Sequence, residues 1–202
     1  MLDGQGLPIT VGNATAVSAY NKAVTEWLDY KVSSMRTLKQ AIELEPDFCI
    51  AHCFRGYLFV TFNSAAVLPA AVASLAKARA LAGTASEREQ RHVAALRHLL
   101  EGAPHRACAC WDEITADYPH DILALRMHHY TCFWSGYRQQ LSALPAAVLP
   151  AWDDTVPHYG NLLGMVAFGL EELGLYDMAE RYGRDAADQN PDDLWAVHAV
   201  AH

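Results

Sequence analysis

Two histidines near the end of the chain have a spacing that can bind a metal ion. His198 and His202 are four residues apart, and on a helix that spacing places two side chains on one face. Such a pair can chelate zinc, but no acidic residue completes a zinc-binding phrase within the chain. We therefore expect ordinary polar contacts from both histidines, and we expect no metal site and no cofactor.

Five cysteines are the next candidates for chemistry. Cys108 and Cys110 are two residues apart, so on a helix they diverge by about 200° and do not chelate one ion together. Cys49 and Cys53 share a helix face, but no phrase of zinc-site spacing accompanies them. We expect small, buried thiols. The odd number of cysteines and the lack of an export signal favour reduced thiols and a cytoplasmic protein.

Other histidines have simpler interpretations. His128 and His129 are adjacent, so on a helix they point about 100° apart and do not face one site together. We expect His128 to be a partly buried packing residue. His92 follows Arg88 by four residues, and we expect it to be a buried hydrogen-bonding residue.

Several function classes are disfavoured by motif and charge. The chain contains no phosphate-binding loop, no dinucleotide fingerprint and no nucleophile elbow. Its formal net charge is −8, with +1 over residues 1–101 and −9 over residues 102–202. Phosphate groups bind clustered cations, so we expect neither nucleic acid nor membrane as a partner. The apolar stretch at 65–76 is interrupted by Pro69, which argues against a membrane span.

The composition predicts a helical protein. Among 202 residues there are 34 alanines but only 18 valines and isoleucines together. Alanine is the best helix former, whereas β-branched residues favour strands. The pattern Ser86-x-x-Glu89 predicts a capping box that opens a helix over Glu87–Leu100. Asn13 is placed to cap a first helix that extends to about Trp27.

Prolines divide the chain at a regular interval. Similar phrases occur at Glu45–Asp47, Tyr118–Asp121 and Asn190–Asp193. Their prolines are separated by 73 and 72 residues, and half of that interval is close to the length of a helical-hairpin repeat of about 34 residues. We therefore predict roughly ten helices, paired as antiparallel hairpins.

The best single repeat runs from Gly160 to Asp193. Its small residues include Ala167 and Ala179, at the positions where the two helices of a tetratricopeptide hairpin cross. Pro191 ends the second helix, because proline cannot continue it. The predicted fold class is all-α: a tetratricopeptide-like α–α superhelix, or right-handed solenoid, of antiparallel helical hairpins.

Seven phrases in series resemble one protein family. They are R-E-Q-R-H-V, A-C-A-C-W-D-E-I, Y-P-H-D-I-L-A-L, S-G-Y, F-G-L-E-E, Y-D-M-A-E and W-A-V-H-A-V-A-H. In this order, from about Asn13 onward, they are similar to the tetratricopeptide repeat protein 38 family. The resemblance implies an α-helical repeat array and no particular reaction or ligand. Members of that family continue past the last phrase, so the chain resembles their N-terminal part.

Two boundaries follow from these patterns. We expect residues 1–12 to be a flexible segment and residues 13–202 to be a helical repeat domain that is truncated in its last hairpin. A repeat unit cannot bury its apolar face alone. We therefore expect the helix after Pro191 to leave an apolar face uncovered, which would favour self-association.

The repeat register places a group of side chains on the concave groove of the array. These candidate binding residues are Arg126, Tyr130, Phe133, Trp134, Asn161, Phe168, Glu171, Trp195, His198 and His202. They form no cationic clamp, so a neutral or cationic ligand suits them best. The predicted function is a scaffold that binds a protein, a peptide or a small molecule in this groove. Two alternatives stay open: an enzyme or metal-dependent catalyst that uses groove histidines, and a structural fragment whose site is incomplete.

Overall fold

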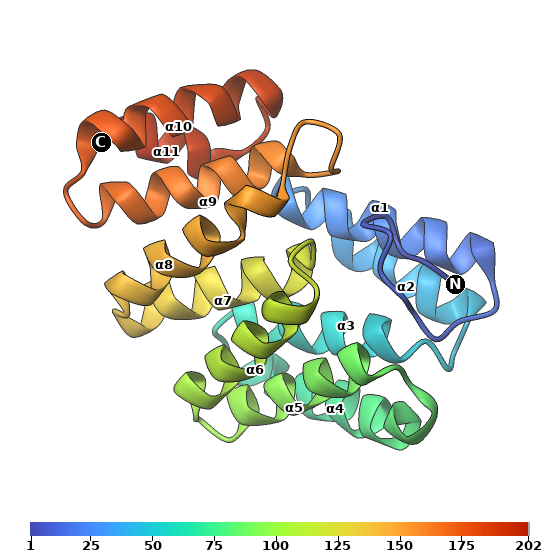
Figure 1. Ribbon diagram of the computed structural model, residues 1–202. Helices are drawn as coiled ribbons and strands as arrows, with labels where there is room; N and C mark the ends of the chain where they lie inside the picture. Colours follow the sequence, from blue (N-terminus) through green and yellow to red (C-terminus); the bar gives the residue numbers. More distant parts are fainter. Residues whose placement is uncertain (202) are drawn as a thin grey trace.

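The computed structural model describes residues 1–201, and within them the chain forms helical hairpins (Figure 1). The hairpins are α1 (Ala14–Leu28) with α2 (Ser34–Leu44), α3 (Cys49–Thr61) with α4 (Leu68–Leu81), α5 (Glu87–Leu100) with α6 (Pro104–Asp117), α7 (Ile122–Ser135) with α8 (Arg138–Val148), and α9 (Tyr159–Glu171) with α10 (Tyr176–Gln189). A further helix, α11 (Leu194–Ala201), packs against α9 and α10. Single turns of 3-10 helix are η1 (Ala65–Val67), η2 (Ala82–Thr84) and η3 (Leu149–Ala151). The all-α hairpin fold is confirmed.

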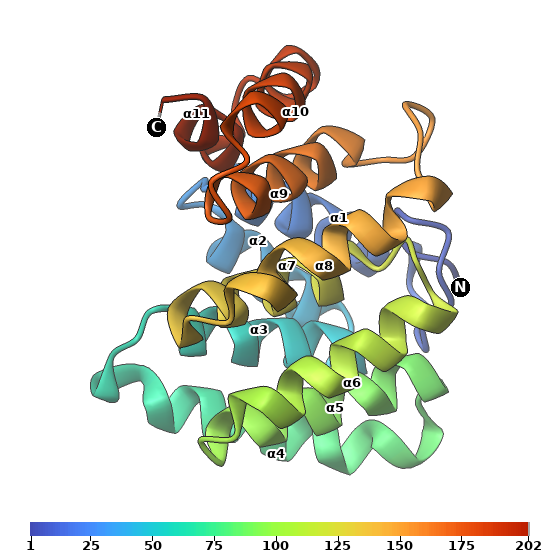
Figure 2. The same ribbon diagram turned by 60° about the vertical axis from the view of Figure 1, so that its left-hand side comes forward.

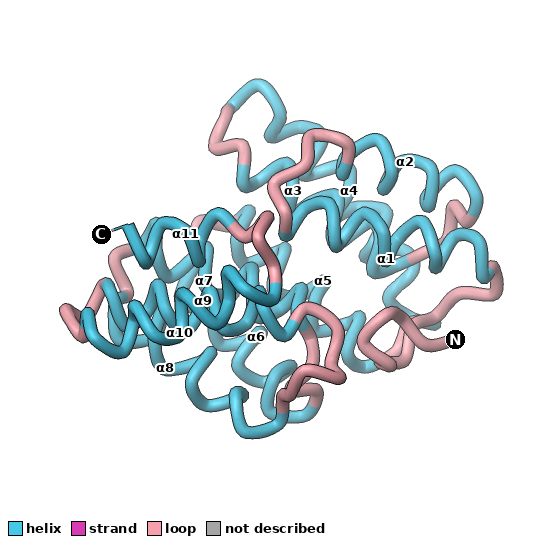
Figure 3. The backbone as a smooth tube through the Cα atoms, turned by 90° about the horizontal axis from the view of Figure 1, so that it is seen from above, coloured by secondary structure: helices cyan, strands magenta, loops and turns pink. Residues whose placement is uncertain are grey.

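From the α3–α4 hairpin onward the hairpins are stacked in chain order, whereas the first hairpin stands outside that order. Figure 2 shows successive layers from α4 at one end to α10 and α11 at the other. In the described part of the chain the only β-type pairing is an isolated bridge between Leu2 and Pro8, and Figure 3 shows helices joined by loops. The helix boundaries follow the predicted signals. Ser86 and Glu89 form the capping box of α5, and the Asn13 side chain accepts hydrogen bonds from the first turn of α1.

Small residues allow the helices to approach closely. Ala167 and Ala179, which the repeat pattern places at crossings, are buried. Gly169 on α9 lies so near α8 that a Cβ there would stand 2.7 Å from the Cα of Ser142. A larger residue at this point would collide with backbone, which has nowhere to move without separating the helices.

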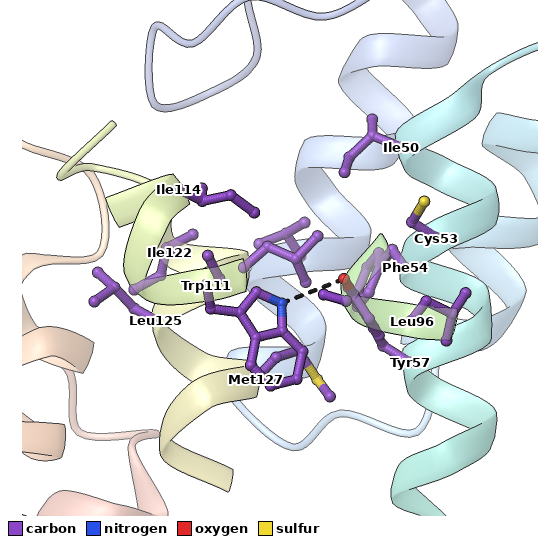
Figure 4. Close-up of a cluster of buried hydrophobic side chains, with 14 of the residues drawn as sticks. Ile50, Cys53, Phe54, Tyr57, Leu96, Trp111, Ile114, Ile122, Leu125 and Met127 are labelled. Atoms are coloured by element: carbon purple, nitrogen blue, oxygen red, sulfur yellow. Dashed lines mark hydrogen bonds between the residues drawn. The ribbon is translucent and has the colours of Figure 1, made fainter. Parts of the chain in front are cut away.

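A main core extends from the first hairpin to α9 and α11, and a second small cluster, which joins α10 to α9 and α11, consists of Leu163, Ala186 and Ala196. Trp111 of α6 and Tyr57 of α3 are fully buried in the main core, and the Trp111 Nε1 donates to the Tyr57 hydroxyl at 3.3 Å (Figure 4). Burying a side chain of this size stabilises the fold by roughly 1.5–3 kcal/mol through the hydrophobic effect. This hydrogen bond gives the buried indole N–H a partner, and the Tyr57 hydroxyl in turn donates to the carbonyl of His92 at 2.8 Å.

The first hairpin folds back onto the far end of the array. Asn190, in the turn before α11, donates to Asp29 at 3.0 Å, and Lys31 pairs with Asp192 at 2.8 Å. These contacts join residues that are 161 positions apart in the sequence. In Figures 1 and 2, α1 and α2 accordingly lie beside α9. The inner side of the array is therefore partly filled by its own N-terminal hairpin.

Residues 1–12 differ from the flexible segment that the sequence suggested. Leu7 and Ile9 are buried, and Asp3 forms a buried ion pair with Arg88 at 3.0 Å. The hydroxyl of Thr10 donates to Glu89 at 2.6 Å. The glycine and polar residues of this stretch are typical of a loop, but the Asp3 carboxylate and the Thr10 hydroxyl have buried partners on α5. These contacts favour an ordered N-terminal segment.

The stretch Ala65–Thr84 is continuous and apolar. It covers 20 residues, and by length and composition alone it could cross a membrane. Only 22% of its most apolar 18-residue portion is buried in the protein. The expectation that Pro69 interrupts it is wrong, because proline is tolerated in the first turn of a helix, where Pro69 lies. The buried face of α4 packs against α3, and its buried residues are Ala71, Ser74, Leu75 and Ala78.

The last described helix packs on one side only. Ala196 and Ala199 of α11 are buried, whereas Leu194 and Val197 are 55% and 48% exposed. Contacts with α9 and α10 place α11 where the first helix of a further hairpin would stand. The predicted self-association stays a prediction, and His202 lies outside the described residues.

Candidate functional site

Three helices bring the predicted aromatic residues together. Phe133 of α7, Phe168 of α9 and Trp195 of α11 pack edge to face, and the closest ring centroids, those of Phe168 and Trp195, are 4.2 Å apart. The His198 ring lies 5.4 Å from that of Phe168. Edge-to-face pairs of this kind are each worth about 0.5–1.5 kcal/mol beyond the area that they bury. The cluster therefore ties α7, α9 and α11 to one another.

Arg126 of α7 lies between two aromatic rings. Its guanidinium carbon is 5.1 Å from the centroid of the Trp195 ring and 5.3 Å from that of Tyr30. The guanidinium also donates to the Tyr30 hydroxyl at 2.7 Å. Burial raises the pKa of Tyr30 to about 12 against the opposing effect of Arg126, so the hydroxyl stays neutral. Cation–π contacts that are shielded from water are the stronger ones, at about 2 kcal/mol.

No sequence pattern pointed to Tyr30 as a site residue. It lies in the turn between α1 and α2 and has a φ of 57°, in the left-handed region that residues other than glycine seldom adopt. This conformation directs the turn toward Arg126, which is 4% exposed. No local pattern predicts the contact, because 96 residues separate the two side chains.

The predicted groove residues do not form one open surface. Arg126, Asn161 and Phe168 are buried, and Asn161 donates to Asp193 at 3.2 Å. By contrast, the Trp134 side chain is 65% exposed. Glu171, like Tyr130, Phe133 and Trp195, is partly buried, and His198 is exposed. A ligand on this side of the molecule would therefore meet only part of the predicted set.

An apolar cavity of about 510 Å³ opens beside Arg126 and Tyr130. Its other lining residues come from the first hairpin, the α1–α2 turn and the end of α3: Trp27, Tyr30, Lys31, Val32, Ser34, Met35, Leu58, Thr61 and Phe62. The Tyr130 hydroxyl donates to the carbonyl of Thr61 at 2.8 Å, which fixes the Tyr130 ring at the cavity wall. The size is within the range of about 300–1,000 Å³ that is typical of ligand sites. Its lining suits a ligand that has an apolar body and, beside it, one hydrogen-bond acceptor for the Arg126 guanidinium.

The polar cluster around Arg88 is of a different kind. Arg88 Nε donates to Asp121 at 2.6 Å, and His92 Nε2 lies 3.0 Å from the same carboxylate. The other ring nitrogen of His92 faces the Tyr57 hydroxyl at 3.1 Å. Burial alone would raise the pKa of Asp121, but Arg88 and His92 outweigh it and hold the pKa well below the usual range. The expected burial of His92 is confirmed, and the cluster links α3, α5 and α7.

The neighbouring histidines of α7 are both buried. Burial lowers the pKa of His128 to about 4. Burial also lowers the pKa of His129, and Arg126 adds to the effect. His129 Nε2 lies 3.2 Å from the carbonyl of Met165 on α9, and its ring packs against Trp195. His129 is therefore a neutral packing residue beneath the aromatic cluster.

The comparisons with known proteins support the fold. No family model matches the sequence. The solved structure of PilW, a widely conserved type IV pilus biogenesis factor, is similar to this chain with a TM-score of 0.50 and 15% sequence identity. The similarity covers 94% of this chain and 88% of the PilW chain. PilW has a tetratricopeptide-like helical repeat fold, and at this level of identity the fold is what the two chains share.

Proposed function

We propose that this chain is a helical repeat scaffold that binds a peptide segment of a protein partner, with an apolar side chain of that segment in the cavity beside Arg126. The cavity itself is the observation that carries the proposal. Helical repeat arrays offer extended concave surfaces to partners, and here part of that surface remains open between the first hairpin and α7.

The lining of the cavity indicates the chemistry of the occupant. Trp27, Phe62 and Tyr130 offer ring surfaces, which suit a large aliphatic or aromatic side chain. Within residues 1–201, Arg126 makes a single hydrogen bond, to Tyr30, so its remaining donors can serve a peptide carbonyl or carboxylate. Burying one such side chain is worth roughly 1.5–3 kcal/mol. That is too little for a stable complex, so the partner must also contact the rim.

The phrases quoted above also support a relationship to the tetratricopeptide repeat protein 38 family, and we propose it on those phrases alone. We further propose that the protein works in the cytoplasm with reduced thiols. All five cysteines are free in the structure, as the reducing interior of a cell would keep them.

A cavity-filling variant tests the binding proposal. Met35 is partly buried and lines the cavity, so Met35→Trp should occupy its space. The matched control is Val72→Trp, which adds the same side chain on the exposed face of α4. A phage-displayed random peptide library is selected on the wild-type chain, and the affinities of the enriched peptides are measured by calorimetry.

We expect enriched peptides to share a large apolar residue and to bind the wild type and Val72→Trp equally. Met35→Trp should bind them at least about tenfold more weakly, which corresponds to a loss of about 1.4 kcal/mol. Peptides that bind all three proteins equally, or a selection that enriches no peptide, would contradict the proposal.

A further inference from the structure

Two adjacent helices bring three metal-binding side chains together and place a fourth, Asp112, beside one of them. Cys108 and Asp112 lie four residues apart on α6, and His128 and Cys132 lie four residues apart on α7. Each pair shares one face of its helix, and α6 packs directly against α7. One donor atom from each of Cys108, His128 and Cys132 lies within 4.8 Å of the other two.

Three of the distances between neighbouring donor atoms are close to those of a tetrahedral site. The two Sγ atoms are 3.8 Å apart, and Cys132 Sγ is 3.7 Å from each ring nitrogen of His128. His128 Nε2 is 3.3 Å from Asp112 Oδ1. Zinc binds sulfur at about 2.3 Å and nitrogen or oxygen at about 2.0–2.2 Å. In a tetrahedron these bonds separate two sulfurs by about 3.8 Å, sulfur from nitrogen by about 3.6 Å, and nitrogen from oxygen by about 3.4 Å.

Burial and access also suit an ion. Cys108, His128 and Cys132 are buried, so neighbouring atoms restrict their rotamers and little entropy is lost when they bind. The side chain of Asp112 is 54% exposed. It stands at the solvent side of the cluster, where an ion can enter and lose its water molecules in steps.

We propose that Cys108, Asp112, His128 and Cys132 form a zinc site that fastens the third hairpin to the fourth. Two sulfur ligands and one imidazole select zinc over magnesium or calcium, which prefer oxygen ligands only. Four protein ligands fill a tetrahedron, which is typical of structural rather than catalytic zinc. The site therefore stabilises the α6–α7 contact and belongs to neither the cavity nor the predicted groove.

This proposal departs from the expectation of no metal site. Cys108 and Cys110, which are close in the chain, do diverge on α6. The partners of Cys108 are instead on the next helix, 20 and 24 residues further along. When two ligands come from each of two packed helices, the four residues do not form one continuous motif in the sequence. The site can therefore be recognised only when the relative positions of the helices are known.

A disulfide between Cys108 and Cys132 is the competing use of the two thiols. Disulfide sulfurs are about 2.05 Å apart, whereas these atoms are 3.8 Å apart. A disulfide would also leave unexplained why His128 and Asp112 converge on the same point. Four converging donors favour the metal.

Cobalt(II) is the probe for the site, because it replaces zinc and is coloured. The full chain, free of any affinity tag, is reduced, treated with a chelator and titrated with cobalt chloride. We expect one equivalent to bind, with the intense visible bands of a tetrahedral site and a near-ultraviolet band from sulfur-to-cobalt charge transfer. Zinc should remove both features by displacement.

Variants assign the ligands. Cys132→Ser should weaken the charge-transfer band by about half, and Asp112→Asn should lower the cobalt affinity at least about tenfold, as losses around metal sites commonly do. Asp112 is half exposed, so its variant tests the site even if Cys132→Ser fails to fold. The matched control is Cys110→Ser, which removes a thiol from the same helix and should leave the spectrum unchanged.

Thermal melting provides an independent measurement, since an ion that binds only the folded state raises the melting temperature. Zinc should raise the melting temperature of the wild type and of Cys110→Ser, but not that of Cys132→Ser. Octahedral cobalt bands without charge transfer, equal binding by Asp112→Asn, or a Cys108–Cys132 disulfide in the mass of the protein purified without reductant would each overturn the proposal.

Discussion

Arg88 and Arg126 are both buried inside the helical array, but one lies among carboxylates and the other between aromatic rings. All three guanidinium nitrogens of Arg88 have partners: Asp121, Asp3 and the carbonyl of Pro8. Arg126 has the Tyr30 hydroxyl and two ring faces. Both arrangements keep a cation away from water, but only the first gives every guanidinium nitrogen a partner.

This difference separates a structural role from a binding role. The Arg88 cluster joins the N-terminal segment, α5 and the start of α7 through charged hydrogen bonds. Arg88 and Asp121 also line a cavity of about 230 Å³, but each guanidinium nitrogen of Arg88 already has a partner in the protein. Arg126 stands at the wall of a cavity with donors to spare. Ring faces hold a cation in place without occupying its N–H groups. A buried arginine that is packed mainly against aromatic rings is therefore the better candidate for binding.

The largest expected effect is that of Arg88→Met. It leaves Asp121 and Asp3 buried without their cation, and breaking a buried pair in this way costs about 3–5 kcal/mol. The free energy of unfolding, measured in urea, should fall by that amount. Arg91→Met, which removes an arginine whose partners Glu87 and Asp117 are mostly exposed, should cause a much smaller change. Equal losses in the two variants would show that the buried cluster contributes no more to stability than an exposed ion pair does.

Acid should weaken the Arg88 cluster before the rest of the molecule. The folded pKa of Asp121 is below the unfolded value of about 3.9, so its contribution is complete above pH 4 and is lost as the pH falls further. Burial, the largest effect on Asp3, raises its pKa despite Arg88, so Asp3 acts in the opposite direction.

Urea unfolding at a series of pH values from 5 to 2 measures this dependence. The stability of the wild type and of Asp3→Asn should fall steeply with pH, whereas that of Asp121→Asn should fall less. A steep fall in Asp121→Asn that equals that of the wild type would assign the acid sensitivity to other groups.

These two clusters also show what the sequence could predict. The alanine content, the proline spacing and the Ser86–Glu89 box predicted the helices and their pairing, because each is a local signal with a direct effect on backbone conformation. The repeat register placed Phe133, Phe168 and Trp195 on one side of the array, and the structure brings them into contact.

Contacts between distant segments could not be predicted in the same way. The α1–α2 turn covers Arg126 because the first hairpin folds back across the array, and Tyr30 lies in a turn that no repeat pattern describes. Asp3 belongs to a glycine-containing stretch that resembles a flexible end, yet its carboxylate is one of the two on Arg88. Cys108 and Cys132 are likewise joined only by the packing of α6 on α7.

A moderate effect is expected where α9 and α10 cross in the half of the molecule that contains Arg126. The side chain of Ala167 is buried, and its Cβ lies 3.7 Å from where a Cβ on Gly183 would stand. Ala167→Leu should therefore overpack the crossing and lower the free energy of unfolding by about 1–3 kcal/mol. Ala76→Leu, on the exposed face of α4, is the control. If the two variants melt at the same temperature, the repeat register is wrong.

The smallest effect on stability is expected from Arg126→Met, the counterpart of Arg88→Met. Methionine fills a similar volume and packs well against rings. The buried carboxylate of Asp193 loses the attraction of Arg126 but keeps its hydrogen bonds from Asn161 and the backbone of Trp195. The variant loses one hydrogen bond worth about 1 kcal/mol and two cation–π contacts worth up to about 2 kcal/mol each. It also no longer keeps a charge away from water, and that burial costs several kcal/mol. The two terms nearly cancel, so the free energy of unfolding should change by no more than about 1 kcal/mol.

Urea unfolding of the two methionine variants side by side measures the contrast, and a loss at Arg126 as large as that at Arg88 would mean that the aromatic site is a structural one. Peptides selected on the wild type should nevertheless bind Arg126→Met more weakly, because the variant keeps the apolar wall of the cavity and loses its donors.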